Sequence, residues 1–280
     1  MMQVLASIPS PSRNLINIGP LELRAYGIMI ALGVIASVWL AGKRYEERGH
    51  NGEHMATIAM WAVPAGVVGA RIYHVITDNQ RFRGNWGEAF KLWEGGLGVW
   101  GGVAAGVLAA LWLMRRRGWD LPDGLDAAAP AIPLAQAIGR VGNWFNQELF
   151  GGPTSVPWAL EIDESHRPTQ YLDEPTFHPT FLYESLWNLL VVAALIWVVP
   201  RLLPNLRRGY LFAAYVLLYT IGRLWIELVR IDTASEIFGI RVNVFTSVIL
   251  GSGAAFVLWR GTRSHAVTGE HEPEASVTNA

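Results

Sequence analysis

The chain has 280 residues, of which 51% are hydrophobic and 16% are charged, and it contains 13 tryptophans and 29 glycines. This composition is typical of a membrane protein and unlike that of an ordinary soluble domain. The formal net charge of -1 gives no indication of a nucleic-acid partner, and the lack of cysteine excludes disulfides, thiolate metal sites and an enzyme cysteine as nucleophile. A thiol that takes part in a reaction must therefore come from a substrate.

Apolar runs long enough to cross a bilayer as helices, at about 20 residues each, recur along the chain. In chain order they are 26–42, 55–76, 96–114, 125–144, 179–199, 210–229 and 242–259. The fourth run is the weakest, because it is rich in alanine and carries Pro130, Pro133 and Arg140. The first run is not a cleaved signal peptide, since its basic residues Lys43 and Arg44 follow the apolar segment. We predict an all-α polytopic membrane protein with seven transmembrane helices.

Charge in the connecting loops predicts the orientation, because short loops rich in Lys and Arg stay in the cytoplasm. The segments after runs one, three, five and seven are all basic: KRYEERGH, RRRGWD, RLLPNLRRG and WRGTRSH. The N-terminus is therefore expected to be extracytoplasmic and the C-terminus cytoplasmic. Segment 146–178 becomes the one sizeable extracytoplasmic loop. We expect residues 1–262 to form a single transmembrane domain and 263–280 to be a disordered cytoplasmic tail.

Several polar residues lie at membrane depth, where ionisable groups are costly and usually line an interior cavity. Arg71 and His74 are three residues apart and share a helix face, as do Arg140 and Asn143. The sixth run carries a polar stripe at spacings of four, four and three, formed by Tyr219, Arg223, Glu227 and Arg230.

Each of these residues also has a purely structural interpretation. Arg223 and Glu227 would form an ion pair that neutralises itself, and Tyr26 and Tyr219 would be aromatic residues of the membrane interface. His74 would be a packing residue, since one histidine is a poor metal site. Glycines such as Gly69 would only let helices approach closely.

Arg71, Arg140 and Arg223 are harder to explain together, because Glu227 can neutralise at most one of them and the fourth run has no acid before Glu148. An external anion is then the natural counter-charge. Phospholipid headgroups are abundant at that depth, and a guanidinium matches phosphate with two parallel hydrogen bonds. The residues predict a lipid phosphate site.

The stretch GRVGNWFNQELFG closely resembles the signature of the bacterial prolipoprotein diacylglyceryl transferase family. Supporting segments in the family's order are LRAYGIM, GARIYHV, GGLGVWGG, HPTFLYES and YTIGRLWIELVR, so that the resemblance extends to about Arg260. It implies a multi-pass protein of the bacterial cytoplasmic membrane with seven spans. It also implies transfer of a diacylglyceryl group from phosphatidylglycerol to the lipobox cysteine of a preprolipoprotein, as a thioether, with release of glycerol phosphate. No metal or organic cofactor is expected.

The resemblance also implies roles for particular residues. Arg140 and Arg223 would bind the phosphate and its developing charge, while Asn143 and Glu148 would shape the headgroup site. Glu227 and Arg230 would orient Arg223. The remaining expected site residues are Tyr26 and Tyr219, as hydrogen-bond donors to lipid or thiol, and Gly95, Gly101 and Gly151, which would provide backbone room. His178 and Glu184 are interpreted as structural, at the start of the fifth span.

One residue departs from the family pattern. Many members have a histidine, proposed as general base, where this chain has Trp100, which cannot accept a proton. The base is then Glu148, Tyr26, Tyr219 or the lipid phosphate, or else the positive field alone generates the thiolate. We favour the field, because nearby positive charge activates a thiol.

Two other classes of protein fit parts of the pattern. An anion or lipid transporter could hold arginines at mid-membrane, but the sequence contains no convincing inverted repeat. An intramembrane hydrolase would need a serine with a base or two aspartates at depth, and neither is evident.

Overall fold

The computed structural model describes residues 7–18, 21–91 and 95–263, and its chain forms two compact units. Unit 1 comprises Met1–Ser37 and Ala128–Ala280, and unit 2 comprises Val38–Ala127. The boundaries between the units fall inside two long helices, α1 (Ala25–Glu46) and α5 (Leu121–Asn146). The predicted tail lies almost wholly outside the described residues. The single domain predicted over 1–262 stays a prediction.

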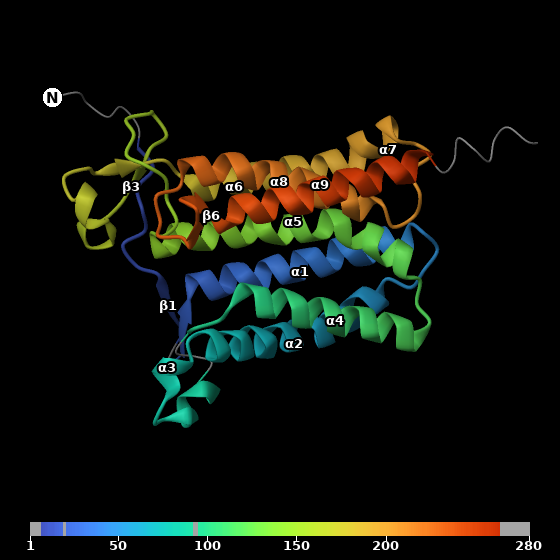
Figure 1. Cartoon of the computed structure of the whole chain (residues 1–280), viewed down its shortest axis with the longest axis horizontal. Helices are drawn as coiled ribbons and strands as arrows, with labels where there is room; N and C mark the ends of the chain where they lie inside the picture. The colour runs from blue at the N-terminus through green and yellow to red at the C-terminus, as the bar shows by residue number, and fades with distance from the viewer. Residues whose placement is uncertain (1–6, 19–20, 92–94, 264–280) are drawn as a thin grey trace, which may run out of the picture. The chain divides into compact units, whose positions relative to one another are not determined.

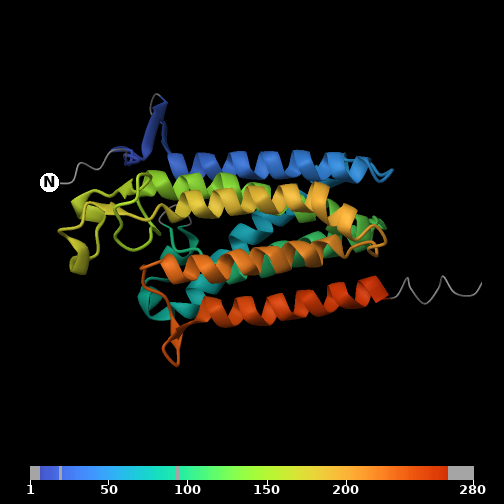
Figure 2. The same cartoon turned by 90° about the horizontal axis from the view of Figure 1, so that it is seen from above.

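Long helices dominate unit 1 (Figures 1 and 2). After α1 and α5 come α6 (Thr180–Ala193), which continues through a π-helical turn, η5 (Ala194–Val198), into α7 (Val199–Leu202). α8 (Leu211–Val229) and α9 (Val242–Arg263) follow, and α8 contacts both α6 and α9. Side chains of α5, α6, η5 and α8 meet in an apolar core that includes Ala129, Val191, Leu195 and Tyr215.

Short antiparallel hairpins, which the sequence patterns did not predict, accompany these helices. β1 (Leu15–Ile18) pairs with β2 (Leu21–Arg24) before α1, and β5 (Glu236–Ile237) pairs with β6 (Ile240–Arg241) between α8 and α9. Neither hairpin is longer than four residues per strand, so the predicted helical class holds.

The predicted extracytoplasmic loop has its own small core. It contains β3 (Leu160–Glu161) paired with β4 (Thr176–Phe177), and two 3-10 turns, η3 (Glu164–His166) and η4 (Thr169–Tyr171). Phe150, Leu160, Ile162 and Phe177 are buried against one another beneath these turns. The loop is therefore a folded cap on the end of α5 and α6 rather than an irregular connection.

Unit 2 is built on two helices in close contact, α2 (Glu53–Thr77) and α4 (Val99–Arg117). Between them lie α3 (Asn79–Phe82) and a 3-10 turn, η1 (Trp86–Phe90). A Cβ added at Gly101 would lie 2.3 Å from the carbonyl oxygen of Gly69, so only glycines permit this approach. α4 ends at Gly118, whose φ of 64° is left-handed and terminates the helix.

Each predicted apolar run corresponds to a helix in the structure. Five segments among the described residues are long and apolar enough to cross a membrane: α1, α2, the continuous helix Thr180–Leu202, α8 and α9. α4 and α5 are not among these five. α5 falls short because its alanines, prolines and polar residues lower its hydropathy, and its side chains are mostly buried or half-buried. A helix enclosed by protein does not need a lipid-compatible surface. The molecule is thus a polytopic membrane protein.

Candidate functional site

Three helices of unit 1 bring arginines together around one carboxylate. Arg140 of α5 places Nε 2.6 Å from Oε2 of Glu184, which lies in the second turn of α6. Nη1 of Arg223, on α8, and Nη1 of Arg230, just beyond α8, lie 3.9 Å and 3.8 Å from Oε1 of the same carboxylate. The Glu184 side chain is only 6% exposed. Arg140 and Arg223, predicted to bind one phosphate, therefore do converge.

A second group of charges supports this centre. Glu227 lies 2.7 Å from Nη2 of Arg223, one helical turn away, and 3.0 Å from Nε of Arg241. Asp232 accepts hydrogen bonds from Nε and Nη2 of Arg230 at 2.6 and 2.8 Å, and lies 3.3 Å from Arg241. We call the seven charged residues the arginine cluster: Arg140, Glu184, Arg223, Glu227, Arg230, Asp232 and Arg241. With four guanidiniums and three carboxylates, it has one positive charge in excess.

The arginines of the cluster differ in how many of their donors are used. Arg230 is held by the bidentate Asp232, and Arg241 donates to the backbone carbonyls of Glu227, Arg230 and Asp232. By contrast, within the described residues Arg223 makes ion-pair contacts but no hydrogen bond. In the same part of the chain, Arg140 makes an ion pair from Nε to Glu184 and one hydrogen bond, from Nη1 to Asn143. Arg140 and Arg223 thus keep N–H groups for a ligand.

Burial and charge act in opposite directions on Arg230 and Asp232, which lie beyond the end of α8. Burial alone would lower the pKa of Arg230, but its hydrogen bond to Asp232 and the charges of Asp232, Glu184 and Glu227 raise it above its ordinary value. Burial would raise the pKa of Asp232, yet hydrogen bonds and charge from Arg230 and Arg241 hold it below its ordinary value. Both groups are therefore fully ionised at neutral pH.

The end of the signature stretch adjoins the cluster. Asn143 accepts a hydrogen bond from Arg140 at 3.3 Å and donates to Glu148 at 2.8 Å, which forms a polar chain from α5 into the cap. Gln147 and Leu149 flank Glu148 and both adopt left-handed φ values, 51° and 58°. Non-glycine residues in this conformation cost free energy and concentrate at functional sites.

Gly151 joins the signature to α8. Its N–H donates to the carbonyl of His178, and its backbone forms a β-bridge with Arg230. A Cβ at Gly151 would lie 2.7 Å from Val229 and 2.8 Å from the Cβ of His178. A side chain does not fit at this position, which is the backbone room expected of Gly151. This close approach fixes Glu148 and Arg230 on neighbouring segments.

The two predicted tyrosines occupy different settings. Tyr26, near the start of α1, is 37% exposed, and its ring packs where a Cβ on Gly142 would stand, one residue before Asn143. Tyr219 is half-buried against the apolar core of unit 1, with its ring 6.0 Å from that of Tyr215. Neither hydroxyl has a hydrogen-bond partner among the described residues, and their roles toward lipid or thiol stay predictions.

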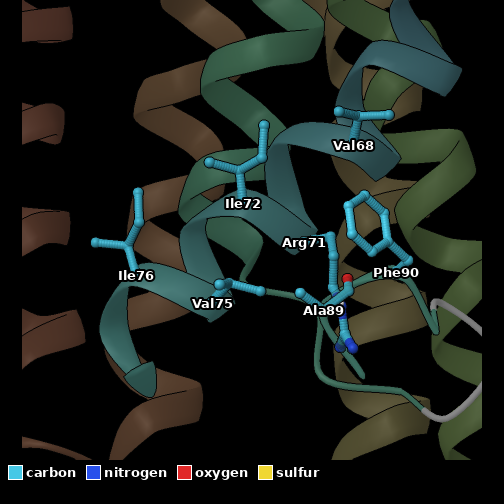
Figure 3. A pocket seen from close by; sticks show the side chains of 7 residues that line it. All are labelled: Val68, Arg71, Ile72, Val75, Ile76, Ala89 and Phe90. Atoms are coloured by element: carbon cyan, nitrogen blue, oxygen red, sulfur yellow. Dashed lines mark hydrogen bonds between the residues drawn. The ribbon is translucent and has the colours of Figure 1, made fainter. Parts of the chain in front are cut away.

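Arg71, in unit 2, is not available to an external anion. Its guanidinium donates to the backbone carbonyls of Glu88, Ala89, Gly95 and Gly96 at 2.6 to 3.0 Å, and it is 7% exposed. Figure 3 shows it beside an apolar cavity of about 380 Å³, with the guanidinium turned toward the loop that carries Ala89. Arg71 therefore does not share an external anion with Arg140 and Arg223 as expected, because backbone carbonyls already accept from its N–H groups.

The other predicted residues of unit 2 lie at the start of α4. Gly95 has a φ of 86° and its carbonyl accepts from Arg71, while no atom lies near its missing Cβ, so conformation and not space requires glycine there. Gly101 is the close-packing glycine of the α2–α4 contact. Trp100 is 51% exposed.

The geometry adds detail to two further expectations. Glu184, interpreted as a structural residue near a helix start, does lie in the second turn of α6, and its carboxylate also contacts Arg140, Arg223 and Arg230. Glu227 contacts Arg223, whereas within the described residues Arg230 contacts Glu184 and Asp232 and not Arg223. The cluster also contains Asp232 and Arg241, which the sequence reasoning missed. The arginines of the cluster are therefore neutralised by three carboxylates, and not by Glu227 alone as expected from the sequence.

A possible metal group is present in unit 2, where His50, Asp120 and Asp123 come close together. Its geometry favours an ion-pair network, since His50 Nε2 lies 2.8 Å from Asp123, and Arg48 contacts both Asp123 and Asp126 at 3.6 Å. A guanidinium at this position supplies the positive charge that a metal would bring.

The fold and the cluster define a class: a polytopic membrane protein that holds partly neutralised arginines where its helices meet a folded cap. The family model described as prolipoprotein diacylglyceryl transferase matches residues 13–260. The chain therefore belongs to the prolipoprotein diacylglyceryl transferase family.

Individual relatives agree over most of the chain. A phosphatidylglycerol–prolipoprotein diacylglyceryl transferase of Frankia alni is 53% identical over 91% of this chain and 67% of its own length. The corresponding transferase 2 of Streptomyces coelicolor is 49% identical over 93% of this chain and 83% of its own. That of Cutibacterium acnes is 46% identical, with 95% and 90% covered.

Proposed function

We propose that this chain carries out the family's reaction, transfer of a diacylglyceryl group from phosphatidylglycerol to the cysteine thiol of a prolipoprotein, at the arginine cluster of unit 1. The observation that carries the assignment is the sharing of Glu184. Arg140 and Arg223 come from different helices, face one carboxylate and keep unused N–H donors. A phosphodiester supplies the missing negative charge and accepts from both guanidiniums.

The polar chain beyond Arg140 suits the rest of the headgroup. Asn143 and Glu148 follow Arg140 in the direction of the cap, and Glu148 is exposed. A carboxylate accepts hydrogen bonds from hydroxyl groups, and the terminal glycerol of phosphatidylglycerol carries two. Glu148 thus selects a glycerol headgroup, while Arg140 and Arg223 hold the phosphate.

In the chemical step, the substrate sulfur attacks the glyceryl carbon that is esterified to phosphate. The sulfur–carbon bond forms as the carbon–oxygen bond breaks, and the electron pair of that bond leaves on glycerol phosphate. Cations aimed at the phosphate oxygens stabilise this developing charge without having to move. The same positive field lowers the pKa of the incoming thiol, whose proton passes to water, so that Trp100 needs no acid–base role.

The seven-span topology also belongs to the proposal. α4 and α5 contain 19 and 26 residues, so at a rise of about 1.5 Å per residue both are long enough to cross a bilayer core of about 30 Å. With seven spans, a single catalytic domain over 1–262 has its cap and the outer end of α8 on the extracytoplasmic side. A chain without cysteine allows a direct test, because Ser165→Cys should react with an impermeant maleimide in intact cells and Asn205→Cys should not. Equal labelling of both would contradict the orientation.

Purified variants test the site assignment. With labelled phosphatidylglycerol and a lipobox peptide, Arg140→Ala and Arg223→Ala should each lower kcat/KM by about 10²- to 10³-fold, the usual cost of one oxyanion donor. Arg201→Ala removes an exposed arginine of α7 and serves as the matched control. Trp100→Phe should retain most activity, which is followed as loss of the peptide thiol. If Trp100→Phe were inactive and Arg140→Ala active, the chemistry would lie elsewhere.

A further inference from the structure

A groove of about 530 Å³ lies between the cap of unit 1 and the segment that follows α8. Three stretches line it: the end of the signature at 146–150, the turns of the cap at 166–170 without residue 169, and residues 231–233. Apart from Asn146, the last residue of α5, its lining residues lie beyond the ends of α5 and α8. The groove therefore lies outside the segments that cross the membrane.

The groove adjoins the arginine cluster through two of its lining residues. Glu148 accepts from Asn143, which in turn accepts from Arg140. Asp232 forms the bidentate contact with Arg230 and lies against Arg241. A molecule in the groove thus meets the cluster directly at Asp232, and on the other side it is separated from Arg140 by Glu148 and Asn143.

The walls of the groove are held in place by side-chain contacts to the cap. Gln147 donates to the carboxylate of Asp163 at 2.7 Å and accepts from its backbone N–H at 2.8 Å. Arg167 donates to the carbonyls of Ile162 and Leu172. With its shape fixed, the groove loses little free energy to ordering when a ligand binds.

The lining chemistry matches a polypeptide better than a lipid. Its floor is apolar, from Leu149, Phe150 and Ile231, and its rim carries the amide of Gln170 and the hydroxyl of Thr233. Side-chain amides and hydroxyls can pair with both the N–H and the C=O groups of a peptide. An acyl chain would leave these polar groups without hydrogen-bond partners.

We propose that this groove binds the residues of the prolipoprotein that directly follow the cysteine to be modified. The inference rests on the proposed function, because that function places the cysteine at the arginine cluster. The apolar signal sequence on the amino side of the cysteine stays in the bilayer. The chain on the carboxyl side must leave the membrane there, where the groove begins.

Two peptides and one double variant test the proposal. The long peptide extends six residues past the cysteine, and the short one ends at the cysteine as an amide. The variant Gln170→Ala/Thr233→Val changes exposed rim residues that lie outside the arginine cluster. It should raise KM for the long peptide about tenfold, the loss expected for one or two hydrogen bonds, and leave kcat and the KM for phosphatidylglycerol unchanged.

The short peptide is the control, since it has no residues to place in the groove. A variant that raised KM equally for both peptides, or raised the KM for phosphatidylglycerol, would overturn the proposal. Fluorescence anisotropy of labelled peptides measures binding without turnover. If wild-type protein bound the long peptide tenfold more tightly than the variant but formed no thioether, peptide binding in the groove would be supported and the proposed reaction would be contradicted. Equal binding of the long peptide by wild type and variant would contradict the proposed role of the groove, whether or not the enzyme is active.

Discussion

Replacing Glu184 by glutamine removes the negative charge that Arg140, Arg223 and Arg230 share, while it keeps the shape and one oxygen acceptor of the side chain. The contact to Arg140, at 2.6 Å from a carboxylate that is 6% exposed, is the closest of the three. Without this charge, α6 offers Arg140 only a neutral acceptor in place of an ion pair. The guanidinium of Arg140 would then no longer be positioned to donate to the phosphate.

The size of the effect follows from the kind of contact. A hydrogen bond between charged groups contributes about 1.5 to 3 kcal/mol. If that free energy is lost from the positioning of Arg140 in the transition state, kcat/KM should fall by about 10- to 150-fold, at about 1.4 kcal/mol per factor of ten. The loss should be smaller than for Arg140→Ala, because the guanidinium is still present.

The assay is thioether formation from phosphatidylglycerol and a lipobox peptide, measured beside the detergent melting temperature of each variant. Glu174→Gln, an exposed acid of the cap, is the matched control and should behave like wild type. A folded Glu184→Gln enzyme with wild-type kcat/KM would refute the positioning role. Glu184→Gln could also be inactive only because it melts below the assay temperature. Glu184→Asp distinguishes this case, because it restores the charge and should recover activity in part.

Two other predictions concern structural charges. Arg71→Met removes the donor of the backbone carbonyls of Ala89, Gly95 and Gly96, while that of Glu88 keeps the N–H of Lys91, and at about 1 kcal/mol or more for each unpaired group the melting temperature in detergent should drop by several degrees. Normal stability of that variant would show that the loop does not depend on Arg71. The lowered pKa of Asp232 means that its contribution to stability is complete above the ordinary Asp pKa of about 3.9 and is lost as pH falls through the folded-state value. Wild-type protein should therefore lose more stability than Asp232→Asn between pH 5 and about pH 2, and parallel melting curves for the two proteins would contradict this.

Hydrophobic run length was enough to predict every long helix, because a bilayer fixes the length and polarity of the segments that cross it. The signature stretch likewise predicted that Arg140, Asn143 and Glu148 lie together, since their close spacing on one helix end makes their contacts local. α5 shows the limit of hydropathy. Its polarity reflects burial within the protein, which a window of sequence does not reveal.

The partners of the arginines could not be predicted in the same way. Glu184 was assigned to a helix start because its distance from Pro179 fits one, and the structure does begin α6 at Thr180. Its ion pairs, however, join residues about 40 positions apart, and only the packing of α5, α6 and α8 decides them. Asp232 and Arg241 lie in the connection around a hairpin that no apolar pattern marked. A signal was available in the runs IELVRID and GIRVN, where charges recur at the ends of apolar segments.

The distribution of donors within the cluster assigns different tasks to its two central arginines. Arg140 is fixed on both sides, by Glu184 and by Asn143, and so presents a donor set whose position is already determined. Arg223 contacts Glu227 through Nη2 at 2.7 Å, but its Nη1 lies 3.9 Å from Glu184, so the Nη1 group can turn toward a ligand while the Glu227 ion pair is kept. A phosphate that meets Arg140 first would therefore draw Arg223 onto itself. The lysine variants should then differ: Arg223→Lys retains a mobile point charge and more of the activity, whereas Arg140→Lys loses the planar fork that holds both Glu184 and the phosphate.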